Sequence, residues 1–234
     1  MAVILNIETS TQVCSVSISV DGKTNAVKES HTKNSHAELL TIFAQQLLSD
    51  EGYAFNELDA IAVSKGPGSY TGLRIGVSTA KGLCYSLNKP LIAITTLDAM
   101  AAGMVARMQN EDLGNTLFCP MIDARRMEVY SALYHPDLSM QRKILAEIID
   151  ENSFQEEFKD HRIIFGGDGA PKCADILSLN NNAHILEDFL CSSSFMGQLS
   201  EQKFREKDFE DVAYFEPFYL KDFVAGIPRV KGLK

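Results

Sequence analysis

No stretch of the 234-residue sequence approaches the roughly 18 consecutive apolar residues that a membrane-spanning helix requires. The opening residues, MAVILNIETS, also lack the basic flank and the small-residue cleavage site of a signal peptide. We therefore expect a cytoplasmic protein without membrane contact. An apolar fraction of 45% beside 23% charged residues is typical of a globular chain, which excludes a disordered or fibrous protein.

The sequence also has fewer basic than acidic residues. The 22 lysines and arginines are outnumbered by 31 aspartates and glutamates, which gives a formal net charge of −9 with neutral histidines. Because an acidic surface repels phosphate backbones, the sequence disfavours nucleic-acid binding by this chain alone unless its charges segregate. Two small basic clusters occur along the chain: Lys203, Arg205 and Lys207, and Arg229, Lys231 and Lys234. Both are typical of a solvated helix face or a chain end.

The five cysteines offer neither a C-x-x-C pair nor a neighbouring histidine at metal-ligand spacing. They are Cys14, Cys84, Cys119, Cys173 and Cys191. Their odd number and wide separation indicate reduced thiols in the core and no metal site. No Ser-His-Asp, Cys-His or paired-carboxylate arrangement stands out either, so the sequence offers no evident catalytic centre.

The first 108 residues predict one lobe with the element order βββαβαβα. Asp21-Gly22 is typical of a hairpin turn, and Ser35 with Glu38 forms a capping box that begins a helix. The strands are expected at 2–7, 13–20, 25–30 and 91–94, with a further buried strand that has 61–63 in its middle, and the helices at 35–48, 73–87 and 97–108.

Residues 109–234 predict a second lobe that repeats this order. Its strands are expected at 117–123, 127–134, 142–149, 162–165 and 183–186. One helix is expected at 152–159, and two more are expected to end at about Leu177 and about Arg205. The segment from Tyr214 onward does not fit the repeat, and it can return to pack on the first lobe. The fold class is therefore α/β, with two tandem βββαβαβα lobes on the plan of the actin-like ATPases and sugar kinases.

Such a plan implies a nucleotide cleft between the lobes, and several turns are candidates for lining it. In the first lobe they are Glu8, Thr9, Ser10 and Thr11 between the first two strands, and Gly66 and Gly68 before a helix. In the second lobe they are Asp123, in a turn with Arg125 and Arg126, and the glycines Gly166 and Gly167. Two of these turns have an ordinary alternative. Glu8 to Thr11 can form a polar hairpin turn that is satisfied by its own backbone amides. Asp123 can form a local ion pair with Arg125 or Arg126.

The glycine loop before the second helix is not a P-loop, because no Gly-Lys-Ser/Thr follows it. More informative is the spacing of Gly72, Gly76, Ala80 and Cys84, which places only small side chains on one face of that helix. Either another helix approaches this face closely, or the face packs on the chain's own sheet. The sequence leaves the two alternatives open.

Six segments in order resemble one bacterial family, TsaB, also called YeaZ. They are ILNIETST, SHAELL, VSKGPGSYTGLRIGVSTAKGL, TTLDAMA, PMIDARRMEVYSALY and YFEPFYLK, between residues 4 and 221. The resemblance implies an actin-like ATPase fold with a degenerate nucleotide site. It also implies a non-catalytic partner of TsaD, which transfers threonylcarbamoyl to the adenosine beside the anticodon in tRNAs that read codons beginning with A.

The resemblance further implies how the subunits meet. Members of the family pair with TsaD, or with themselves when alone, through the two helices of the first lobe. The residues implied here are His36, Leu39, Leu40, Phe43, Leu47, Gly72, Gly76, Ala80 and Leu83. A third protein, TsaE, completes the set, and tRNA is contacted only indirectly. No cofactor of the chain's own is implied, although ATP or ADP can lie at or near the partner interface.

One departure bears on catalysis. TsaD binds its metal through a His-x-x-x-His pair, whereas the matching stretch here carries His36 and then Leu40. The missing ligand argues against a metal site, and therefore against the hypothesis that the protein is a metallopeptidase. The second hypothesis is a small-molecule kinase or ATPase of the same fold acting alone, with Glu8 and Asp123 around a magnesium nucleotide.

Overall fold

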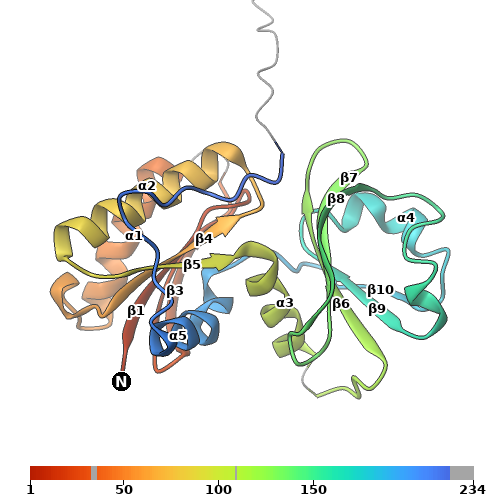
Figure 1. Cartoon of the computed structure of the whole chain (residues 1–234), viewed down its shortest axis with the longest axis horizontal. Helices are drawn as coiled ribbons and strands as arrows, with labels where there is room; N and C mark the ends of the chain where they lie inside the picture. Colours follow the sequence, from red (N-terminus) through yellow and green to blue (C-terminus); the bar gives the residue numbers. More distant parts are fainter. Residues whose placement is uncertain (33–35, 109, 222–234) are drawn as a thin grey trace, which may run out of the picture.

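The computed structural model describes residues 1–32, 36–108 and 110–221. Figure 1 shows two lobes side by side, each built on a twisted sheet. Both sheets have five strands, three of them antiparallel and the others parallel to the central strand. The predicted cap Ser35 and the cluster of Arg229, Lys231 and Lys234 lie outside the described residues.

The first sheet has the strand order β3-β2-β1-β4-β5. Its strands are β1 (Val3–Glu8), β2 (Cys14–Val20), β3 (Lys23–Ser30), β4 (Ala60–Gly66) and β5 (Leu91–Thr95). The helices are α1 (His36–Asp50), α2 (Tyr70–Leu87) and α3 (Thr96–Arg107), with a short 3-10 turn η1 (Phe55–Glu57). The predicted order βββαβαβα is confirmed for this lobe.

Local sequence explains where these elements begin and end. Asp21 and Gly22 both have positive φ, as the tight β2–β3 turn requires. Ser69 caps α2, since its Oγ accepts a hydrogen bond from the Gly72 N–H at 3.3 Å. Asn88 ends the helix in the left-handed conformation.

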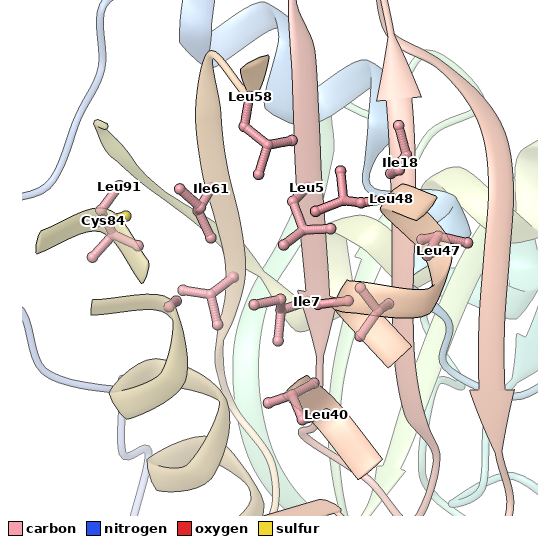
Figure 2. Close-up of a cluster of buried hydrophobic side chains, with 14 of the residues drawn as sticks. Leu5, Ile7, Ile18, Leu40, Leu47, Leu48, Leu58, Ile61, Cys84 and Leu91 are labelled. Carbon is pink, nitrogen blue, oxygen red and sulfur yellow. The ribbon is translucent and has the colours of Figure 1, made fainter. Parts of the chain in front are cut away.

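The core of the first lobe lies between this sheet and the helices α1 and α2. Figure 2 shows Leu5 and Ile7 of β1 pointing toward Leu40, Leu47 and Leu48 of α1. All five side chains are at most 2% exposed. Burial of each contributes about 1.5–3 kcal/mol, so this cluster sets the position of α1 on the sheet.

The opposite face of β2 is buried as well, although its side chains are serines. The Ser15 Oγ lies 2.7 Å from the Ser193 Oγ, and the Ser17 Oγ donates to the Ser193 carbonyl at 2.9 Å. Ser193 belongs to the 3-10 turn η4 (Ser193–Phe195), which covers this face. The serines are therefore buried with hydrogen-bond partners, which offsets the cost of removing them from water.

The second sheet has the order β10-β9-β6-β7-β8. Its strands are β6 (Thr116–Asp123), β7 (Glu128–Tyr134), β8 (Met140–Ile148), β9 (Arg162–Gly166) and β10 (Ala183–Ile185). The helical elements are short: η2 (Glu157–Lys159), η3 (Pro171–Cys173) and α4 (Ala174–Leu177).

The helix predicted at 152–159 is wrong. The segment forms turns, and only η2 has a helical hydrogen-bond pattern. Phe154 has a φ of 63°, which interrupts a right-handed helix. The turn lets the Phe154 and Phe158 rings lie 5.2 and 6.2 Å from the Phe165 ring of β9, so the packing of aromatic rings overrides the helix propensity of the acidic residues.

After the second sheet the chain returns to the first lobe. The helix α5 (Gly197–Glu206) packs on β1 and β5. Residues 208–221, here called the strap, then run beside α2, where the Lys81 ammonium donates to the Phe215 carbonyl at 3.0 Å. The strap is the dark blue segment of Figure 1. It ends at Lys221, which forms an ion pair with Glu128 of the second lobe. Among the described helices, none is both long and apolar enough to cross a membrane.

Candidate functional site

A cleft with a volume of about 710 Å³ lies where the two lobes meet. Its walls are the β1–β2 turn, the first turn of α2, the β6–β7 turn and the end of the strap. The residues that define these walls are Ser10, Thr11, His36, Gly68, Tyr70, Asp123, Arg125, Tyr130, Asp168, Tyr219 and Lys221. The cleft is thus the place where the predicted nucleotide residues can be tested.

On the first-lobe wall, the chain's own hairpin turn occupies the space in front of the glycine loop. The Ser69 N–H donates to the Ser10 carbonyl at 2.6 Å, and the Thr9 Oγ1 donates to the Gly72 carbonyl at 2.8 Å. A Cβ on Gly68 would lie 2.6 Å from the Ser10 Cβ, so only glycine allows this approach. The loop therefore holds the β1–β2 turn where a phosphate would otherwise lie.

Glu8 points into the protein and does not line the cleft. Its side chain is fully buried, and its Oε1 accepts hydrogen bonds from the Ser10 N–H at 2.6 Å and the Ser64 hydroxyl at 2.9 Å. These bonds fix the β1–β2 turn. Glu8 is therefore out of reach of a magnesium nucleotide in the cleft.

The space beside the glycines predicted to face an adenosine is occupied by other residues of the same chain. A Cβ on Gly166 would meet Phe189 at 3.0 Å and Met104 at 3.1 Å, and Gly167 is packed against Met100 and the Met121 carbonyl. Methionines of α3 thus occupy the position expected for a base. Gly66 is covered in the same way, by the Phe218 carbonyl of the strap.

The prediction of nucleotide-lining residues therefore needs correction. Ser10, Thr11, Gly68 and Asp123 do line the cleft. Five others are turned into the core or covered by the chain itself: Glu8, Thr9, Gly66, Gly166 and Gly167. A nucleotide bound in the manner of an actin-like ATPase does not fit this arrangement.

The β6–β7 turn carries charge toward the cleft. Asp123 forms an ion pair with Lys172, and its Oδ1 accepts the Arg125 N–H at 2.8 Å. The predicted local ion pair of Asp123 with Arg125 or Arg126 is therefore wrong: Asp123 pairs with the distant Lys172, and its contact with Arg125 is to the backbone N–H. Arg125 and Arg126 are exposed and have φ values of 73° and 53°.

Asp168 provides a pH-dependent prediction. Burial raises the pKa of its carboxyl above the usual value of 3.8, while its Oδ1 accepts the Asp123 N–H at 3.1 Å. Because the folded state holds this proton more tightly than the unfolded state, the carboxyl lowers stability as pH rises through its folded pKa. Asp168→Asn keeps the acceptor, so its thermal midpoint relative to the parent should rise as the pH increases above the usual carboxyl pKa of 3.8. A constant or falling difference in differential scanning calorimetry would contradict this.

His36 and the cysteines are buried in the structure. The His36 ring is 7% exposed, and its Nε2 lies 3.1 Å from the Thr11 carbonyl oxygen, to which it donates. Leu40, at the position of the missing ligand, is in the core. All five cysteines are buried, and burial raises the pKa of the Cys84 thiol to about 12. Within the described ranges, no three His, Cys, Asp or Glu side chains gather to hold a metal ion.

The predicted partner interface also needs correction, because five of its residues face inward. Leu40 and Leu47 are 1% and 2% exposed in the core. A Cβ on Gly72 or Gly76 would overlap Thr9, and Ala80 is fully buried. The small face of α2 therefore packs on the chain's own first lobe, with Gly72 and Gly76 against the β1–β2 turn and Ala80 in the core with the sheet, which is close to the second of the two alternatives.

A different surface of the same helices is open. Ile42 of α1 is 45% exposed, Tyr85 of α2 is 86% exposed, and a Cβ on Gly82 would have no neighbour within 4 Å. Of the predicted residues, Leu39, Phe43 and Leu83 are half-buried. We call the surface formed by Ile42, Ile75, Ser78, Gly82, Tyr85 and Ser86 the outer α1–α2 face. Ser78, Gly82 and Ser86 repeat every four residues, so the spacing of small residues in the sequence marks this second face of α2 as well.

The comparisons with known proteins agree with this architecture. The model of a family described as "TsaD: tRNA N6-adenosine threonylcarbamoyltransferase" matches residues 23–228. The solved structure of YeaZ from Pseudomonas aeruginosa superposes with a TM-score of 0.80 at 24% identity and covers 94% of this chain and 100% of that one. The predicted fold class, two α/β lobes of actin-like type, is confirmed.

Curated relatives give the closer assignment. The tRNA threonylcarbamoyladenosine biosynthesis protein TsaB of Escherichia coli is 32% identical, over 95% of this chain and 96% of that protein. TsaB of Bacillus subtilis is 30% identical, over 93% of each chain. With identity of this degree along almost the whole of both relatives, the chain belongs to the TsaB (YeaZ) family.

Proposed function

We propose that this chain is an accessory subunit in the biosynthesis of threonylcarbamoyladenosine in tRNA, and that it acts by binding and stabilising a catalytic TsaD subunit. The names of its full-length relatives support the pathway. The observation that carries the accessory role is the outer α1–α2 face, which the chain leaves open although both helices are otherwise packed on its core.

The chemistry of this face suits helix pairing. Ile42 and Ile75 supply apolar contact, and Gly82 with its flanking serines allows the backbone of another helix to approach closely. Two related subunits can present the same pair of helices to each other about a pseudo-twofold axis. The same geometry lets a second copy of this chain occupy the face when TsaD is absent.

The closed first-lobe wall supports a role without catalysis by this chain. Thr9 and Ser10 fill the phosphate position, and Glu8 is buried away from the cleft. The same contacts disfavour the second hypothesis, a kinase or ATPase acting alone. A nucleotide at or near the partner interface, TsaE as a further partner and a cytoplasmic location remain predictions.

The test is reconstitution. The chain is mixed with TsaD of the same organism, with and without ATP, and the mass of the complex is measured by gel filtration with light scattering. Threonylcarbamoyl transfer to a tRNA transcript is then assayed with TsaE present. We expect a complex, and transfer that requires both proteins. ATP turnover by this chain alone without complex formation would overturn the proposal.

A further inference from the structure

Arginines without ion pairs gather at the rim of the cleft. In the basic cluster of α5, Lys203 pairs with Asp208 at 2.5 Å and Arg205 with Glu201 at 2.7 Å. Three arginines at or beside the cleft, by contrast, have no carboxylate within ion-pair distance among the described residues: Arg125, which lines the cleft, Arg126, the next residue, and Arg74, one helical turn after Tyr70. None of the three is held by a carboxylate in an ion pair, although Arg74 is held by the neighbouring tyrosines.

The acidic side chains nearby do not cancel this charge. Asp123 is paired with Lys172, and Glu128 is paired with Lys221. The Asp168 carboxylate accepts the Asp123 N–H at 3.1 Å, and burial raises its pKa above the usual value. On the first lobe Arg74 also interacts electrostatically with Glu216, whereas Arg125 and Arg126 are exposed on the second lobe with the neighbouring Asp123 and Glu128 already engaged by lysines.

An aromatic platform lies beside these arginines. The Tyr70 and Tyr219 rings are 4.9 Å apart, and the Arg74 guanidinium lies 4.1 Å from the centre of the Tyr70 ring. The Arg74 Nε donates to the Tyr219 hydroxyl at 3.2 Å, which holds the guanidinium in place. Tyr130 faces the same cleft from β7. The two rings are tilted by 38° to each other. Tyrosine rings and arginine guanidinium groups are the side chains on which proteins stack unpaired bases.

The backbone of the opposite wall is strained. Arg125 and Arg126 are consecutive residues with positive φ, a conformation that costs energy for side chains other than glycine, asparagine and aspartate. A strained turn is retained only where something compensates for it, and here the turn presents two free arginines beside the cleft.

The interior of the cleft favours a nucleic-acid strand over a free nucleotide as the ligand. The positions for a deep phosphate and a base are filled by Ser10 and by Met100 and Met104, so a ligand binds at the rim. The free arginines stand on two different lobes, an arrangement that suits phosphates spaced along a chain better than the phosphates of one small molecule.

We propose that the rim of the inter-lobe cleft binds an unpaired segment of RNA directly, with bases on the Tyr70–Tyr219 platform and phosphates on Arg74, Arg125 and Arg126. The inference rests on the proposed function, which supplies tRNA as the RNA. It goes beyond that function, because the chain then contacts the substrate itself and does not act only through its partner.

The test uses a variant that removes charge and relieves strain together. Arg125→Asn with Arg126→Gly introduces residues that accept positive φ, so its thermal midpoint should not fall. In complex with TsaD, the variant is titrated with a fluorescent tRNA transcript and followed by anisotropy. We expect at least fivefold weaker binding, and a plot of log K against log salt that is shallower by about 1.4, from about 0.7 for each single-strand phosphate contact. Arg107→Ala, an exposed arginine at the far end of α3, is the control and should change binding less than twofold.

Three results would overturn the inference. Binding could be unchanged in the Asn-Gly variant, or equally reduced in the Arg107→Ala control. Alternatively, millimolar ATP could displace the transcript in a manner that depends on Arg125, which would identify a site for a free nucleotide. Gel filtration of the same samples reports on complex formation, so a failure of the subunit-pairing proposal is seen separately.

Discussion

An Ile42→Glu variant should lose its association with TsaD and leave tRNA unmodified in the reconstituted reaction. Ile42 is 45% exposed, so the protomer can accept a glutamate there without repacking. At an interface the carboxylate would be desolvated without a partner, at a cost of about 2–4 kcal/mol. The Kd measured by titration calorimetry should therefore rise by a factor of about 30 to 1,000.

The matched control is Leu179→Glu, which places the same charge on an apolar residue of the second lobe that is 70% exposed. It should bind TsaD like the parent. Gly82→Leu tests the same face with bulk in place of charge, because it adds a side chain where the protomer has open space. Wild-type affinity in both Ile42→Glu and Gly82→Leu would show that the subunits meet through another surface.

Two glycine-to-alanine substitutions on α2 should change stability in opposite directions. At Gly76 the new methyl group would overlap the Thr9 Oγ1, and overpacking of this kind costs about 1–3 kcal/mol. At Gly82 nothing lies within 4 Å, so alanine should stabilise the helix by about 1 kcal/mol. Urea unfolding followed by circular dichroism measures both free energies of unfolding.

A double-mutant cycle identifies the cause. Thr9→Ala removes the Oγ1 that Gly76→Ala would strike, but it also removes the hydrogen bond to the Gly72 carbonyl. The double variant should therefore be more stable than the sum of the two single effects predicts, by about 1 kcal/mol or more. Strict additivity, or a stable Gly76→Ala single variant, would mean that the hairpin turn does not pack on this face.

The first lobe was predictable because its elements are specified locally. Asp21 and Gly22 fix the hairpin, and the small-residue repeat beginning at Gly72 marks a helix face that needs close contact. What touches that face is not a local property. Only the tertiary structure shows that Thr9, 63 residues earlier than Gly72, fills it in place of a partner.

The same limit explains the errors at the candidate nucleotide site. Gly166 and Gly167 have the sequence of a ligand-binding turn, but Met100 and Met104 of a distant helix occupy it. The helix expected at 152–159 has suitable propensities, yet the packing of Phe154 on β9 requires a turn. Each error lies where a contact between distant parts of the chain overrides a local signal.

The serine face of β2 has a consequence for synthesis on the ribosome. Ser15 and Ser17 find their buried partners in Ser193, so this face of the first sheet stays open until the η4 turn has been translated. At about 5–20 residues per second, the interval between the two segments lasts about 10–35 s. The nascent first lobe therefore cannot bury this face until almost the whole chain has been synthesised. On a ribosome stalled before Ser193, the serine face of β2 would stay exposed.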